Sequence, residues 1–166
     1  MKIIFALMML FPFFGNAQKT LDELLQQYNT RSIPYISVEE ARMLQMKNKS
    51  LFLDAREREE YDVSHIPNAE FVGYNTFSSE EISKKISDKS RPIIVYCSLG
   101  IRSEQIAEKM KKAGFTNIRN MYGGIFEWKN TEYPVEDHNG NKTENVHAFS
   151  KQWGKWLKKG IKIYDK

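Results

Sequence analysis

Residues 93–106 have the sequence IIVYCSLGIRSEQI, in which a strand, a loop and a helix are expected in turn. The first four residues are almost wholly apolar and mostly β-branched, which is typical of a strand buried on both faces of a parallel sheet. Residues 97–102 form the loop. Apolar residues at helical spacing from 106 to 113 predict a helix that begins near Ser103. The order strand, loop, helix is half of a βαβ unit.

The alternation of strands and helices extends to both sides of this segment. Short apolar runs predict three more strands, at residues 51–53, 70–72 and 117–121. Capping boxes of the form Ser/Thr-x-x-Glu begin three predicted helices, at Thr20, Ser37 and Ser78. Shorter helices are expected at 57–61 and from Gly123-Gly124 through Trp128. The pattern predicts an α/β domain with a mostly parallel sheet of about five strands and helices on both faces.

The N-terminus has the features of an export signal. Lys2 precedes an apolar run over residues 3–14, and small residues then favour cleavage before Gln18. An uncleaved membrane anchor is the alternative, but the run is short beside the roughly 20 apolar residues of a membrane span. We therefore expect a signal peptide at 1–17 and a periplasmic or secreted protein with no stable membrane span after cleavage.

The rest of the chain divides into three predicted segments: a helical extension at 18–34, the α/β domain at 35–136, and a basic amphipathic extension at 137–166. Residues 137–146 are polar and rich in turn formers, which suggests a boundary. Beyond them, four apolar residues recur at helical spacing: Phe149, Trp153, Trp156 and Leu157. This stripe predicts a helix that packs back on the domain. A surface for a membrane or a partner protein is the alternative.

Composition argues against several classes of function. The net charge is only +4 and the lysines are spread along the chain, so no nucleic-acid partner is expected. His65, His138 and His147 lack ligand spacing, and there is one cysteine, so neither a metal nor a cofactor is expected. The absence of Cys-x-x-Cys argues against a thioredoxin-like oxidoreductase.

Cys97, the single cysteine, cannot form an internal disulfide, so it is either a buried bystander or a reactive thiol. Its predicted place is the carboxyl end of a central strand, where ligands bind in open α/β sheets. The amides of the following helix, a loop containing Gly100 and the cation of Arg102 all favour a thiolate there. We expect a lowered pKa for this thiol.

The loop resembles the active-site loop of the rhodanese family, which has its cysteine first, a glycine fourth and often an arginine or threonine sixth. Three further stretches resemble family motifs. Asp54-Ala55-Arg56 is similar to an early Asp-x-Arg, and His65-Ile66-Pro67-Asn68-Ala69 to a Gly-His-Ile-Pro-Gly-Ala turn, with departures at Ser64 and Asn68. Gly123-Gly124 with Trp128 is similar to a closing Gly-Gly-x-x-x-Trp. The matches follow the family's order over about residues 35–135.

The resemblance implies a three-layer rhodanese-like fold and a sulfurtransferase that carries sulfur as a persulfide on catalytic Cys97. Donors would be small sulfur-containing anions such as thiosulfate, or persulfides, and the acceptor a thiol or an acceptor protein. Substrate binding is expected from Ser98, Leu99, Gly100, Ile101, Arg102, Ser103 and Arg56. We expect Arg56 also to pair with an acid inside the domain, and Asp54, His65 and Trp128 to be structural.

Two other functions stay open at this point. A related phosphatase or arsenate reductase would resemble Cys-x5-Arg, whereas four residues separate Cys97 from Arg102 here. The shorter loop favours a single sulfur atom over a tetrahedral phosphate. A binding module or sulfur carrier without efficient turnover is the other alternative, because Ser98 and Leu99 stand where the best-known thiosulfate enzymes carry cations.

Overall fold

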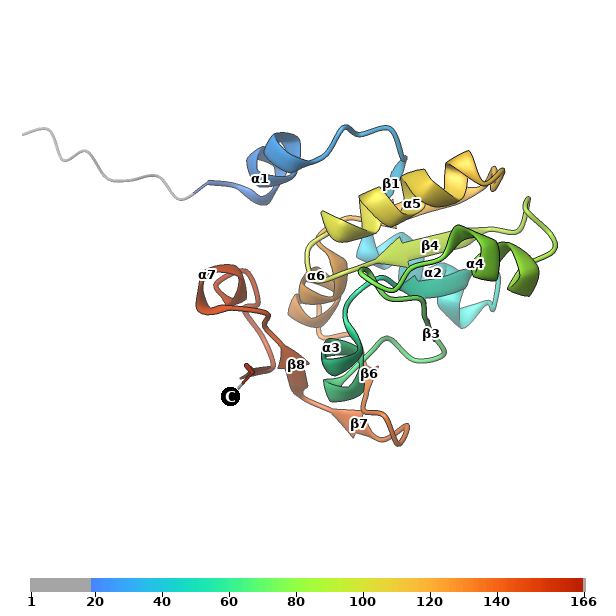
Figure 1. Cartoon of the computed structure of the whole chain (residues 1–166). Helices are drawn as coiled ribbons and strands as arrows, with labels where there is room; N and C mark the ends of the chain where they lie inside the picture. The colour runs from blue at the N-terminus through green and yellow to red at the C-terminus, as the bar shows by residue number, and fades with distance from the viewer. Residues whose placement is uncertain (1–18, 166) are drawn as a thin grey trace, which may run out of the picture.

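A computed structural model describes residues 19–165 of the chain (Figure 1). The predicted signal peptide at 1–17 lies outside the described residues. Within them, no helix has the length and apolar character needed to cross a membrane.

The main sheet has five parallel strands in the order β1-β5-β4-β2-β3. Their bounds are β1 Tyr35–Ile36, β2 Leu51–Asp54, β3 Glu70–Phe71, β4 Ile93–Tyr96 and β5 Ile118–Met121. Strand β4 lies in the middle, where Ile93 pairs with Leu51 of β2 and Ile118 of β5. The predicted parallel sheet is confirmed, and the additional strand is β1, whose two residues are too few to show a periodic pattern.

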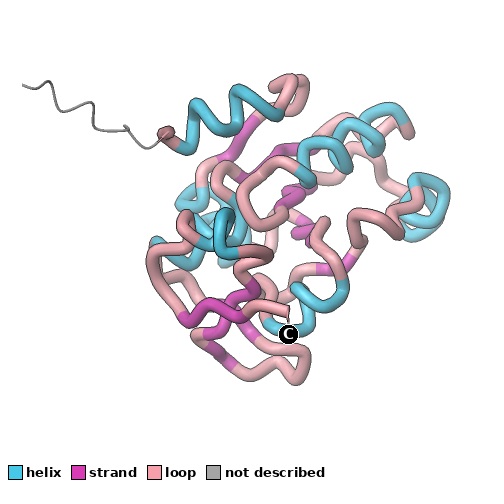
Figure 2. The backbone as a smooth tube through the Cα atoms, turned by 60° about the vertical axis from the view of Figure 1, so that its left-hand side comes forward, coloured by secondary structure: helices cyan, strands magenta, loops and turns pink. Residues whose placement is uncertain are grey.

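Helices cover both faces of this sheet, which makes the predicted three layers. One face, with Phe52 and Ile94, packs against α2 (Val38–Met46) and α6 (Gly124–Asn130). The other, with Leu53 and Val95, packs against α4 (Ser79–Lys85) and α5 (Arg102–Lys112). Figure 2 shows the helices arranged around the strands. Burial on both faces explains why β2 and β4 are continuous apolar runs.

Two more helices lie near the carboxyl edge of the sheet. They are α1 (Leu21–Tyr28), ahead of the main domain, and α3 (Arg58–Val63), which follows β2. The predicted caps are present: the hydroxyls of Thr20, Ser37 and Ser78 each accept a hydrogen bond from the amide three residues later. Only Thr20 also has the reciprocal bond of a full capping box, from its own amide to Glu23.

The C-terminal extension differs from the single helix that its apolar stripe predicts. Residues 137–146 belong largely to a hairpin of β6 (Val135–Glu136) and β7 (Lys142–Thr143), and β8 (Asn145–His147) then pairs with β9 (Ile161–Ile163). Between them lies α7 (Lys151–Gly154), a single turn. The helix prediction was wrong because Phe149 has a left-handed backbone, with φ of 63°, and Ser150 caps a helix that begins only after it.

The extension nevertheless packs on the domain, as expected. Val146 and Leu157 are fully buried and belong to the same apolar cluster as Phe126 and Trp128 of α6. Trp153 and Trp156 are partly buried against that cluster. Figure 1 shows α7 and α1 on the same side of the molecule.

Candidate active site

Cys97 directly follows β4, at the carboxyl end of the central strand of the sheet. Its side chain is only 2% exposed. Neighbouring parallel strands end at the same edge, so the loops after β2 and β5 lie beside the loop that carries Cys97. The thiol therefore lies where the sheet brings the most chain segments together.

The backbone of the loop is held from outside by α6. The carbonyl of Cys97 accepts the amide of Ile125 at 2.9 Å, and the carbonyl of Ser98 accepts that of Phe126 at 3.1 Å. Gly124 makes this approach possible: a Cβ there would lie 2.2 Å from the Cys97 carbonyl oxygen, and its φ is +55°. The Gly-Gly motif thus brings the start of α6 into contact with the active-site loop.

A third carbonyl, that of Gly100, is held by two asparagines. Asn29, which follows α1, and Asn120 of β5 each donate a side-chain amide hydrogen to it, both at 2.8 Å. With three loop carbonyls bonded on the outside, the amides between them are free to turn toward the sulfur. Neither asparagine could be predicted from the sequence, because each reaches Gly100 from a different segment of the chain.

The sulfur itself accepts hydrogen bonds from the loop and the start of α5. The amide of Gly100 donates to Sγ at 3.1 Å, and the hydroxyl of Ser103 lies 3.5 Å away. That hydroxyl also lies 2.7 Å from the Oδ1 of Asn120, so its one proton has two acceptors within reach. Helix α5 has no side-chain cap, and the sulfur lies beside its first turn, next to Ser103.

These contacts lower the pKa of the Cys97 thiol, as the sequence predicts. Burial alone would raise the pKa, because a charged sulfur loses its solvation. The charge of Arg102, the hydrogen bonds from Ser103 and the amide of Gly100 together outweigh that effect. The site therefore favours a thiolate, the nucleophilic form.

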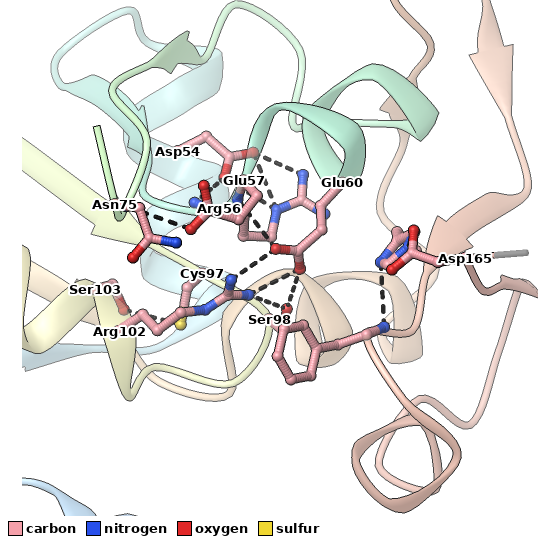
Figure 3. Close-up of polar contacts among 12 residues, drawn as sticks. Asp54, Arg56, Glu57, Glu60, Asn75, Cys97, Ser98, Arg102, Ser103 and Asp165 are labelled. Atoms are coloured by element: carbon pink, nitrogen blue, oxygen red, sulfur yellow. Dashed lines mark hydrogen bonds and ion pairs between the residues drawn. The ribbon is translucent and has the colours of Figure 1, made fainter. Parts of the chain in front are cut away.

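Arg102 is not a free cation, because Glu60 of α3 pairs with it. The two guanidinium nitrogens contact the two carboxylate oxygens at 2.6 and 2.8 Å. The hydroxyl of Ser98 joins them, donating to Glu60 and accepting from Arg102, each at 3.0 Å. Burial opposes ionisation of Glu60, but Arg102 lowers its pKa to about 2. Figure 3 shows Glu60 between Arg102 and Arg56.

Glu60 is a site residue that sequence reasoning missed. It follows β2 by a few residues, yet its partner Arg102 lies 42 positions later in the chain. The spacing of acids and bases along a sequence does not predict such a pair. The burial of Glu60, which sets it apart from its exposed neighbour Glu59, appears only in the folded structure.

Arg56 corrects one prediction, since it does not line the site. The side chain is 0% exposed; its Nη2 contacts Asp54 at 2.6 Å and donates to the carbonyl of Ser64 at 2.6 Å. The guanidinium makes the expected internal ion pair with Asp54, and its charge also contributes to the lowered pKa of Glu60. The other expected structural residues behave alike: Asp54 accepts from the Arg56 amide, His65 contacts the Tyr61 carbonyl, and Trp128 is buried.

A cavity of about 140 Å³ opens over the sulfur. From the loop, it is lined by Cys97, Ser98, Leu99, Ile101 and Arg102. Gly100 and Ser103, which were also predicted to bind substrate, do not line this cavity. Both contact the sulfur itself. The remaining lining residues, Phe149 and Trp153, come from the C-terminal extension. In the sequence both belong to the apolar stripe, for which packing on the domain was expected and a membrane or partner surface was the alternative, so neither was predicted to line the site. Over residues 19–165, no three metal-binding side chains are grouped as a metal site would need.

Comparisons with known sequences agree with this geometry. The family model of the rhodanese-like domain matches residues 37–131. Thiosulfate sulfurtransferase GlpE from Coxiella burnetii (strain RSA 493 / Nine Mile phase I) is 34% identical over 106 residues, covering 64% of this chain and 95% of that protein. The tRNA uridine(34) hydroxylase from Escherichia coli O139:H28 is 33% identical over 98 residues. That match covers 57% of this chain but only 28% of the hydroxylase.

Solved structures show the same fold. The rhodanese-like domain of the Alr3790 protein from Anabaena sp. has a TM-score of 0.57 at 24% identity, over 63% of this chain and 79% of that one. Thiosulfate sulfurtransferase from Pseudomonas aeruginosa has a TM-score of 0.59 at 22% identity, over 76% of this chain and 24% of that one. The predicted three-layer, rhodanese-like fold is confirmed.

Proposed function

Because the chain belongs to the rhodanese-like domain family, we propose that it is a sulfurtransferase that carries sulfane sulfur on Cys97 as a persulfide. The observation that supports this most is the sulfur at the start of α5, with the amide of Gly100 donating to it at 3.1 Å. The thiosulfate sulfurtransferases among the similar proteins support the same function. The similarity to a tRNA hydroxylase covers one part of that protein and is consistent with a shared domain.

The proposed reaction is a double displacement at sulfur. The Cys97 thiolate attacks the outer sulfur of the donor, and a new S–S bond forms while the donor's own S–S bond breaks. With thiosulfate the bonding electron pair leaves with sulfite; with a persulfide the leaving thiolate takes the persulfide's proton. An acceptor thiolate then attacks the outer sulfur, and Cys97 leaves as a thiolate again.

The loop would stabilise the charge of the intermediate. A persulfide places its negative charge one atom beyond Sγ, where it faces the inward amides of the loop and the first turn of α5. Amides that are already oriented need no reorganisation during the reaction, which is how an oxyanion hole lowers a barrier. The outside bonds to the carbonyls of Cys97, Ser98 and Gly100 hold that orientation.

The experiment is intact-mass analysis after incubation with a sulfur donor. We expect the protein to gain one sulfur atom from thiosulfate or a low-molecular-weight persulfide, and to lose it again when a thiol acceptor is added. Cys97→Ser should gain none, and it is an unambiguous control because the chain has no second cysteine. If no donor loads the wild-type protein, the proposal fails.

A sulfur carrier or binding module of the same fold is the second candidate. It is favoured by the burial of Cys97 and by the pairing of Arg102 with Glu60, because Arg102 is the cation among the described residues that line the cavity. A carrier would load sulfur in the mass experiment but release it to a thiol no faster than a small persulfide does. A phosphatase is less well supported, and Cys97-dependent hydrolysis of a phosphate ester would favour it.

A further inference from the structure

The cavity over Cys97 is closed on one side by residues that lie outside the matched rhodanese-like domain. That match ends at residue 131, whereas Phe149 and Trp153 belong to the extension beyond it. The extension therefore supplies one wall of the cavity over the sulfur.

The aromatic side chains are held in place rather than laid loosely over the loop. The amide of Phe149 donates to Nδ1 of His147 at 3.2 Å, and Nε2 of that ring lies 2.9 Å from the carboxylate of Asp165. Since an amide can only donate, Nδ1 is the acceptor and Nε2 carries the proton toward Asp165. Figure 3 shows Asp165 on this side of the site, away from Arg56 and Asp54. The second aromatic residue, Trp153, packs edge-on against Tyr28 of α1, and the two ring centroids are 6.0 Å apart.

The backbone of Phe149 indicates that its position matters. Its φ of 63° lies in the left-handed region, which costs free energy for any residue with a Cβ. In return, its ring is directed at the loop, with its centroid 5.0 Å from the Cζ of Arg102. The ring is still 47% exposed, so packing in the core does not account for this placement.

The cavity offers a poor environment for a small dianion. Apart from the sulfur, its walls are mainly the side chains of Leu99, Ile101, Phe149 and Trp153. Its one cation, Arg102, is paired with both oxygens of Glu60 and faces the Phe149 ring. The second charge of thiosulfate would therefore meet apolar groups instead of a hydrogen-bond donor, at a cost in desolvation.

The cavity suits a donor whose body is apolar and whose only charge is at the transferable sulfur. Its volume is about 140 Å³, and an apolar protein cavity of about 150 Å³ holds one benzene ring. We propose that Phe149 and Trp153 determine specificity for organic sulfane-sulfur donors with an apolar group of about this size. This inference rests on the proposed function and names the substrate class for the same site.

The chemical step with an organic thiosulfonate is balanced without a further reactant. The Cys97 thiolate attacks the terminal sulfur and forms the new S–S bond, while the bond from that sulfur to the sulfonyl group breaks. Its electron pair leaves with the sulfinate, and the negative charge of the donor's terminal sulfur remains on the outer sulfur of the persulfide. The apolar group of the sulfinate stays against the aromatic side chains until release.

The test compares two donors that share the reacting group, benzenethiosulfonate and methanethiosulfonate, with thiosulfate as a third. Wild-type kcat/KM for sulfur loading should be about tenfold higher for the benzene compound than for the methane compound, the usual value of an apolar group in a fitted pocket. Phe149→Ala with Trp153→Ala should remove this preference, so that the ratio of the two kcat/KM values falls from about ten to about one. Phe149→Leu should retain part of the preference, which guards against a folding defect.

The matched control is Ile161→Ala, which removes an apolar side chain of the same extension that is 57% exposed and does not line the cavity. It should leave the preference unchanged. Equal wild-type rates for the two thiosulfonates, with loading intact, would overturn this inference and leave the proposed function standing. A failure of every donor to load Cys97 would overturn both.

Discussion

At the scale of single residues, the site depends on which backbone groups are bonded outside the loop. The carbonyls of Cys97 and Ser98 are bonded by the first amides of α6, and that of Gly100 by Asn29 and Asn120. The amide of Gly100 is thus left to donate to the sulfur. Gly124 is critical to this arrangement, although it touches no substrate.

Gly124→Ala should disrupt the loop. The new Cβ would lie 2.2 Å from the Cys97 carbonyl oxygen and 2.7 Å from the carbonyl of Ser98, and the φ of +55° disfavours a side chain. Because the close atoms are backbone, the loop itself has to move. We expect sulfur loading to fall at least tenfold and stability to fall by about 1–3 kcal/mol. Loading kinetics and thermal unfolding measure the two effects.

The control for this variant is Gly140→Ala. Gly140 also has a positive φ, of +78°, but a Cβ there meets nothing within 4 Å. Gly140→Ala should therefore lower stability by straining its turn, but it should not slow sulfur loading. Equal loading by Gly124→Ala and the wild-type protein would contradict the role given to the Gly-Gly motif.

At the scale of elements, α3 and α5 are tied together by the pair of Glu60 and Arg102. Burial opposes the charge on Glu60, but the guanidinium lowers its pKa to about 2, well below the ordinary value of 4.5. A carboxylate with a lowered pKa in the folded state stabilises the protein above its unfolded pKa. That stabilisation is lost as the pH falls from about 4.5 toward 2.

Glu60→Gln should therefore destabilise the protein at neutral pH, by on the order of 1–3 kcal/mol, because Arg102 keeps one hydrogen bond but loses its counter-charge. The difference in the free energy of unfolding between the wild-type protein and the variant should become smaller as the pH falls below about 4.5. Urea unfolding at several pH values measures it. Glu59→Gln, on the exposed neighbouring residue, should show neither effect. If this difference in unfolding free energy did not change with pH, the charge of Glu60 would not contribute to stability.

How much the sequence predicts also depends on the element. The strands β2 and β4, the helices with capping residues and the loop of Cys97 follow from local patterns, because period, caps and motif lie within a few residues. Glu60, Asn29 and Asn120 could not be predicted, since each meets its partner only through the fold. The C-terminal helix was predicted wrongly because helical spacing of apolar residues does not show the left-handed turn at Phe149.

At the scale of the whole molecule, segments from both ends of the described chain complete the central domain. Helix α1 leads to Asn29 and contacts Trp153 through Tyr28, and the C-terminal extension supplies the aromatic side of the cavity. The sheet positions the thiol, the N-terminal extension bonds its loop through Asn29, and the C-terminal extension lines the cavity above it. Sulfur transfer through Cys97 requires that the pKa of this thiol is lowered despite its burial.

The most direct measurement is the pH dependence of iodoacetamide alkylation of Cys97, followed by intact mass. The lowered pKa predicts that alkylation of the folded protein reaches half its maximal rate at a lower pH than that of the same chain in denaturant. The lone cysteine makes each measured rate that of one group. A midpoint equal to or above that of the denatured chain, or a folded protein that does not react at all, would contradict the account.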